Sequence, residues 1–93
     1  MLVKLISIER AISGSYTLKE VLINPKHIVM VTDAPSWKRR LSEGVLPTGL
    51  HSETNFSRLI LADSNYNKEM VIIGTPSEIE NKVSLTAKRI LRG

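Results

Sequence analysis

Short apolar runs, each rich in Val, Ile and Leu, occupy most of the first two thirds of the chain. Turn-forming residues separate most of them: Ser13-Gly14-Ser15 follows the first run, and Pro25 ends the second because proline has no N–H to donate to a sheet. The runs predict five strands, at residues 2–8, 16–23, 27–32, 57–62 and 68–73. Short connections favour antiparallel neighbours, so a five-stranded antiparallel β-meander is the simplest topology.

The C-terminal segment has a helical pattern instead. Thr75 can cap a helix, Pro76 suits its first position, and Glu78 lies three residues after the cap, as in a capping box. Apolar residues then recur at spacings of four, four, three and one, which makes one apolar stripe: Ile79, Val83, Ala87, Ile90 and Leu91. We therefore expect a C-terminal α-helix over residues 75–92 across one face of the sheet, and an α+β fold.

Two of the predicted strands are apolar on both faces. Leu59 and Leu61 point to one side of the sheet while Ile60 and Ala62 point to the other, and residues 70–73 repeat this pattern. One helix covers only one face. The second face must then be covered in another way: the sheet curls into a barrel-like form, the face packs on residues 33–55, or it meets another subunit. A partner chain is the interpretation that we favour.

Residues 33–55 lack regular strand character, and we expect an irregular insertion at about 33–55 within a single domain of residues 1–93. A structureless connection of this length is uncommon in a compact domain. Ser36 is positioned to cap a short helix in which Trp37 and Leu41 share a face and which Gly44 ends. Part of the insertion is therefore expected to be helical.

Three stretches of these elements carry a resemblance to a known family. They are Ile23-Asn24-Pro25-Lys26-His27-Ile28, an asparagine–proline turn before a strand; Arg58-Leu59-Ile60-Leu61, followed after a turn by Met70-Val71-Ile72-Ile73; and Ser77-Glu78-Ile79 at the helix start. Together they resemble the small flagellar FlbD/SwrD-type proteins, which consist of a short β-meander and a C-terminal helix. The resemblance covers residues 16–33 and 56–92 and implies a non-enzymatic accessory role. A small phage or mobile-element protein of similar design is an equally open alternative.

Composition and charge indicate a small globular protein with anionic partners. The chain has 93 residues, of which 42% are apolar and 24% charged, as in single folded domains. Its net charge of +4 favours anionic over cationic partners. Cysteine is absent, which excludes disulfides and thiolate metal sites. With neither a secretion signal nor an apolar run near the roughly 20 residues that span a bilayer, we expect a soluble, cytoplasmic protein.

Residues that support catalysis or metal binding are scarce. His51 and Glu53 stand two residues apart and could contact one metal ion, but a metal site needs more ligands. No nucleophile elbow accompanies Ser57 or Ser64, and no glycine-rich phosphate loop is present. We therefore expect no enzyme activity, no metal and no cofactor.

Two groups of basic residues are the candidate binding residues. The first is Trp37, Lys38, Arg39 and Arg40, which combines guanidinium groups that bind phosphate or carboxylate with an indole that can stack on a base or fill a protein pocket. The second lies on the predicted helix at about 180° to 300° from Ile79, opposite the apolar stripe: Lys82, Leu85, Lys88, Arg89 and Arg92. A plainer interpretation stays open for both, in which Trp37 anchors the core and the cations are solvated.

The function that we expect is that of a small non-catalytic binding or regulatory module, which acts through protein–protein contacts as a homo-oligomer. The alternative is a nucleic-acid-binding protein that uses both basic groups. Salt distinguishes the two, because binding to phosphates weakens steeply as the salt concentration rises whereas binding at an apolar protein interface does not.

Overall fold

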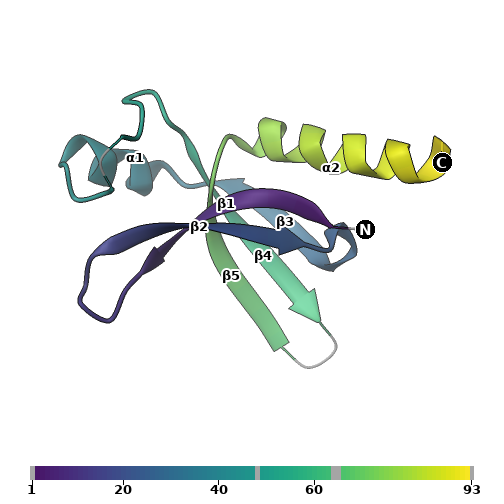
Figure 1. The fold of residues 1–93 in the computed structure, drawn as a ribbon, viewed down its shortest axis with the longest axis horizontal. Coiled ribbons are helices and arrows are strands. Elements are labelled where there is room, and N and C mark those ends of the chain that lie inside the picture. Colours follow the sequence, from purple (N-terminus) through teal and green to yellow (C-terminus); the bar gives the residue numbers. More distant parts are fainter. Residues whose placement is uncertain (1, 48, 64–65, 93) are drawn as a thin grey trace.

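The computed structural model describes residues 2–47, 49–63 and 66–92, and it describes the side chains of all of these except residues 63, 66 and 86–92. Its elements, in chain order, are β1 (Val3–Arg10), β2 (Tyr16–Ile23), the 3-10 helix η1 (Pro25–His27), β3 (Ile28–Asp33), α1 (Pro35–Ser42), β4 (Phe56–Asp63), β5 (Tyr66–Ile73) and α2 (Pro76–Arg92) (Figure 1). No helix among the described residues is long and apolar enough to cross a membrane. The expected α+β class is confirmed.

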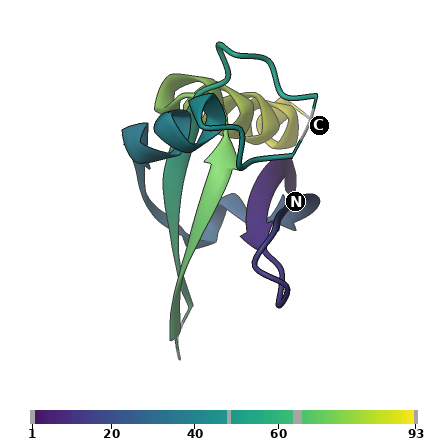
Figure 2. The same ribbon diagram turned by 90° about the vertical axis from the view of Figure 1, so that its left-hand side faces the viewer.

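The five strands form one sheet in the order β2-β1-β5-β4-β3, and all four neighbouring pairs are antiparallel. Consecutive strands pair at β1–β2, β3–β4 and β4–β5, as a meander requires, and β1 pairs with β5. Figure 2 shows the β1–β2 hairpin and the β4–β5 hairpin diverging below the two helices. The sheet is not closed into a barrel, because β2 and β3 remain as its two edges.

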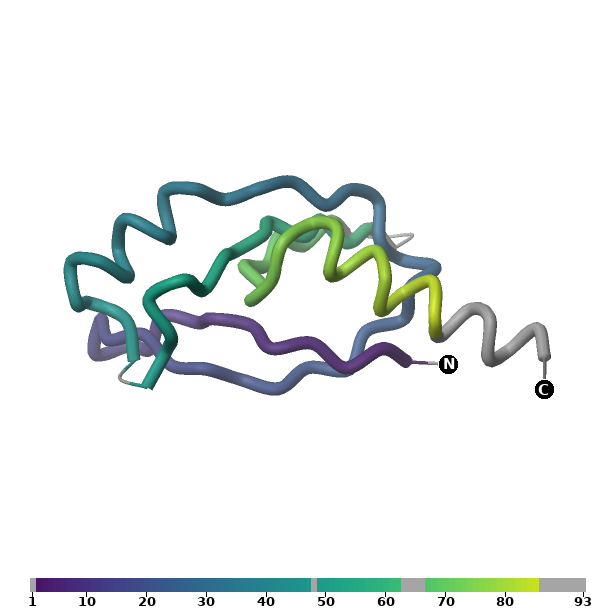
Figure 3. Tube along the Cα trace, turned by 90° about the horizontal axis from the view of Figure 1, so that it is seen from above, coloured from purple at the N-terminus to yellow at the C-terminus, as the bar shows by residue number. Residues whose placement is uncertain are grey.

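The placement of β2 and β3 at opposite edges requires a strongly curved sheet. They lie along opposite sides of the molecule and are joined at one end by η1 (Figure 3). Five Cα–Cα steps from Ile23 to Ile28 reach at most about 17 Å even when extended, whereas four gaps of a flat sheet span about 19 Å. Because three of the linking residues are in a compact 3-10 turn, the real reach is shorter still. The sheet is therefore curled, which was one of the three alternatives for the second apolar face, but it remains open.

Helix α2 begins as the sequence predicts and covers the first apolar face. The Thr75 hydroxyl accepts a hydrogen bond from the Glu78 backbone N–H at 3.1 Å, which confirms the cap. Ile79 is buried and Val83 half-buried against a core that includes Leu5 of β1. The other residues of the predicted stripe, Ala87, Ile90 and Leu91, lie outside the described side chains.

The insertion contains the predicted short helix, but with a different start. Ala34 is the N-cap residue and makes no side-chain hydrogen bond; Pro35 is the first helical residue, so the prediction of Ser36 as the cap is wrong. Proline takes that position because its φ is preset for a helix and its missing N–H needs no partner there. The predicted stop is confirmed: Gly44 has φ +76°, and its N–H donates to the Leu41 carbonyl at 3.1 Å.

The insertion also covers much of the second apolar face. Ala34 and Leu46 are buried with Ile8 of β1 and Phe56 of β4, and Trp37 packs against this cluster. Alternate residues of a strand point to opposite faces, so Ile8 lies on the face opposite Leu5 and α2. At this end of the sheet, packing on residues 33–55 therefore takes the place of the partner chain that we favoured.

Candidate functional site

A cleft opens in the sheet where β1 and β5 diverge. These strands pair at only two positions, Ser7 with Ile72 and Ile8 with Val71, whereas β1 and β2 pair along eight. The cavity between the diverging segments has a volume of about 370 Å³, with walls from residues 7–10 of β1 and 68–71 of β5. We call it the β1–β5 cleft. Its size lies in the lower part of the usual range for ligand sites.

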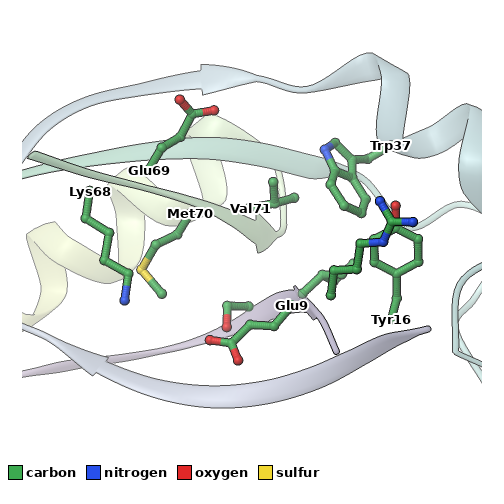
Figure 4. Close-up of a pocket in the computed structure, with 10 residues that line it drawn as sticks. Glu9, Tyr16, Trp37, Lys68, Glu69, Met70 and Val71 are labelled. Atoms are coloured by element: carbon green, nitrogen blue, oxygen red, sulfur yellow. The ribbon is translucent and has the colours of Figure 1, made fainter. Parts of the chain in front are cut away.

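Two aromatic residues close one end of the cleft. Trp37 of α1 meets Tyr16 of β2 edge to face, with ring centroids 5.2 Å apart, and lies 6.5 Å from the ring of Phe56. Figure 4 shows Tyr16 and Trp37 together at this end, with Lys68 and Met70 extending from β5 across the gap. Trp37 is half-buried, so it anchors α1 to the sheet and forms a wall of the cleft at the same time.

Two arginines extend the aromatic pair into a four-residue stack. The guanidinium of Arg40 lies 4.4 Å from the centroid of the Trp37 ring, and that of Arg10 lies 5.9 Å from the centroid of Tyr16. We call these residues the arginine–aromatic stack. A guanidinium over an aromatic ring keeps its N–H groups available at its edge, so each arginine can still donate hydrogen bonds.

Sequence reasoning found Trp37 and Arg40 but missed Arg10 and Tyr16. The signal was available in the first predicted hairpin. Extending its strands toward the Ser13-Gly14-Ser15 turn brings Arg10 opposite Tyr16, the pair with which the β1–β2 register ends. Cross-strand neighbours of this kind are within side-chain contact distance.

The remaining predicted binding residues are distributed away from the stack. Lys38 donates a hydrogen bond to Asn55 at 3.4 Å, and Arg39 is exposed. On α2, Lys82 and Leu85 are exposed. The side chains of the other three, Lys88, Arg89 and Arg92, lie outside the described part of the chain. Figure 1 shows α1 and α2 at opposite ends of the molecule, so the two groups of candidate residues do not form one continuous site in the described structure.

The charges that line the cleft differ in whether they already have a partner. Glu9 lies 3.9 Å from Lys19 of β2, and Glu69 forms an ion pair with Arg58 of β4. Among the described side chains, neither Lys68 nor Arg10 has a carboxylate within ion-pair distance. Arg10 makes a cation–π contact with the ring of Tyr16. Both acids therefore have a basic partner outside the cleft, while its two cations have no acidic partner among the described side chains.

A second cavity, of about 380 Å³, lies between β3 and α2. Ile28 and Val31 line it from the strand, and Ile79 and Val83 from the helix. It is an apolar groove beside the outer edge of β3, with no aromatic residue in its lining.

The described residues hold no group of three or more His, Cys, Asp or Glu side chains that could bind a metal ion. The pair that the sequence suggested has a local structural role. The Nδ1 atom of His51 accepts a hydrogen bond from the Glu53 backbone N–H at 3.0 Å, which closes a turn. His51 itself is exposed.

No protein-family model, curated protein or solved structure matches this chain. The β1–β5 cleft, with its aromatic end and its charged walls, is the feature of this molecule best suited to binding.

Proposed function

We propose that this protein is a non-catalytic binding module that holds a segment of a partner protein in the β1–β5 cleft. The observation that supports this is the composition of the walls. Ile8, Met70 and Val71 supply apolar surface, Tyr16 and Trp37 supply an aromatic end, and two strand edges supply backbone groups. Interfaces between proteins combine these components. The proposal agrees with the accessory role that the resemblance to FlbD/SwrD-type proteins implies, and we assign it to the cytoplasm, since the absence of cysteine fits a reducing compartment.

Nucleic-acid binding is the second candidate. The net charge of +4 and the exposed cations Lys38 and Arg39 support it. One feature of the cleft favours a protein partner instead. Arg10 and Arg40 lie over the aromatic rings on which bases would stack.

We also propose that the module self-associates through its sheet edges. Leu18 and Leu22 of β2 are exposed at 41% and 59%, and Val29 and Met30 of β3 at 63% and 47%. Edge strands of soluble monomers are usually protected by charged residues or covered by other elements. β2 carries Lys19 and Glu20, but β3 has no charged residue before Asp33. β3 is therefore the edge that is less protected against pairing with another chain.

Filling the cleft tests the proposed function. In Lys68→Phe, an exposed strand position receives a ring that occupies the cavity, and aromatic residues suit strands, so the fold should be retained. Lys26→Phe makes the same change at an exposed position of η1, outside the cleft, and is the matched control. In affinity capture from the native host, we expect the parent and Lys26→Phe to retain a protein that Lys68→Phe loses.

Two results of this experiment would contradict the proposed function. Equal capture of that protein by Lys68→Phe would show that the cleft is not its site. Recovery of nucleic acid that is released when salt is raised to about 0.5 M would favour the second candidate, because counterion release makes phosphate binding steeply salt-dependent.

A further inference from the structure

We infer that the occupant of the β1–β5 cleft is an extended polypeptide segment that carries carboxylate side chains. This inference rests on the proposed function and names the chemistry of its partner. It follows from two properties of the cleft that are independent of each other: the free strand edges and the uneven neutralisation of the charges.

The unpaired strand edges of the cleft favour an occupant with an extended backbone. β1 is paired with β2 as far as Arg10, and β5 is paired with β4 along its whole length. On their facing sides the ladder stops after Ile8 and Val71, so residues 9–10 and 68–70 present edges with no strand partner. Backbone N–H and C=O groups at a strand edge need partners, and an extended segment supplies donors and acceptors at matching intervals. Addition of a strand is a common form of peptide recognition.

The charged side chains that line the cleft favour carboxylates on that segment. Glu9 and Glu69 are paired with Lys19 and Arg58, whereas Arg10 and Lys68 have no carboxylate partner among the described side chains. The cleft therefore offers two cations, one on each wall, to whatever enters it. Arg10 also lies over the ring of Tyr16, with its guanidinium carbon 5.9 Å from the ring centroid, and a guanidinium can form paired hydrogen bonds with a carboxylate.

Trp37 provides a direct readout of occupancy. It is the only tryptophan of the chain and lines the cleft, so its fluorescence should change when a segment enters. The probes are an acetylated and amidated Val-Glu-Val-Glu-Val peptide, the matched Val-Gln-Val-Gln-Val peptide, and oligothymidylate. The two peptides share β propensity and shape and differ in charge alone.

We expect the glutamate peptide to bind about tenfold more tightly than the glutamine peptide. Arg10→Gln and Lys68→Gln should each weaken binding of the glutamate peptide by about fivefold to tenfold and leave binding of the glutamine peptide unchanged. Lys26→Gln, which removes an exposed cation of η1 that does not line the cleft, is the matched control and should bind like the parent. All three positions are exposed, so every variant should remain folded, and only Arg10→Gln, which loses its contact with the Tyr16 ring, should melt slightly below the parent.

Other results separate this inference from the proposed function. Equal binding of the two peptides would overturn the carboxylate preference and still support a protein-binding cleft. If neither peptide binds but Lys68→Phe loses its captured partner, the extended acidic segment is wrong and the cleft remains the site. Preferential binding of oligothymidylate would overturn both in favour of nucleic acid.

Discussion

Trp37 joins α1 to the sheet and closes one end of the β1–β5 cleft. It packs edge to face on Tyr16, and Arg40 lies over its ring. Its neighbours in the sequence, Lys38 and Arg39, are exposed. The sequence suggested a single binding cluster of four consecutive residues. In the structure two of them pack and two are exposed, because adjacent side chains of a helix point in different directions.

This division can be measured as stability. Trp37→Ala should lower the free energy of unfolding by about 2–3 kcal/mol, less than for a fully buried aromatic because Trp37 is half-buried. Arg40→Ala should cost about 1 kcal/mol through the lost cation–π contact. Lys38→Ala and Arg39→Ala should stay within about 0.5 kcal/mol of the parent. Urea denaturation followed by circular dichroism measures all four; a Trp37→Ala variant as stable as the parent would contradict the anchoring role.

The two helices are held by different kinds of interaction. α2 starts at a side-chain cap and lies on the sheet through Ile79, which is 1% exposed. α1 has no side-chain cap and no fully buried residue; its contacts with the second core come from Trp37 and Leu41, and Arg39 and Arg40 in its last turn complement the helix dipole. At eight residues it is too short to be stable alone. Its position therefore depends on tertiary packing.

The cap of α2 is open to a simple test. Thr75→Ala removes the acceptor for the Glu78 N–H and should lower the free energy of unfolding by about 1 kcal/mol. Thr75→Ser keeps the hydroxyl and should restore most of this loss. The midpoints of thermal unfolding of the two variants provide the comparison. If the two substitutions were equally harmful, the methyl group and not the hydrogen bond would be what matters.

The molecule as a whole leaves two sheet edges open, and this leads to the prediction of self-association. Sedimentation equilibrium at tens of micromolar, on the order of usual working concentrations, should show an oligomer. Val29→Lys places a charge on the exposed part of β3, the edge that has no charged residue before Asp33, and should shift the equilibrium toward monomer. Leu85→Lys, at an exposed position of α2 outside the two edge strands, is the control. A strict monomer for the parent would count decisively against the proposal.

Much of the local structure could be predicted from the sequence, because its causes are local. Alternating and apolar runs located the five strands, and the Thr75 and Gly44 signals located one end of each helix. The start of α1 was misplaced because Ser36, a favourable capping residue, follows a proline that occupies the first helical position. Of the candidate site, Trp37 and Arg40 were recognised, since an isolated tryptophan beside a basic run is visible in the sequence itself.

By itself, the sequence determined the α+β class, the strands and the C-terminal helix, since periodicity and capping act over a few residues. Only the tertiary structure decided that β1 lies beside β5, that residues 33–55 cover the second face at one end of the sheet, and that Arg10 and Tyr16 stand beside Trp37. Backbone hydrogen bonds between strands are nearly the same for any pair of sequences. The choice of strand partner therefore comes from how the whole chain packs, and the cleft exists because that packing lets β1 and β5 pair at two positions and no further.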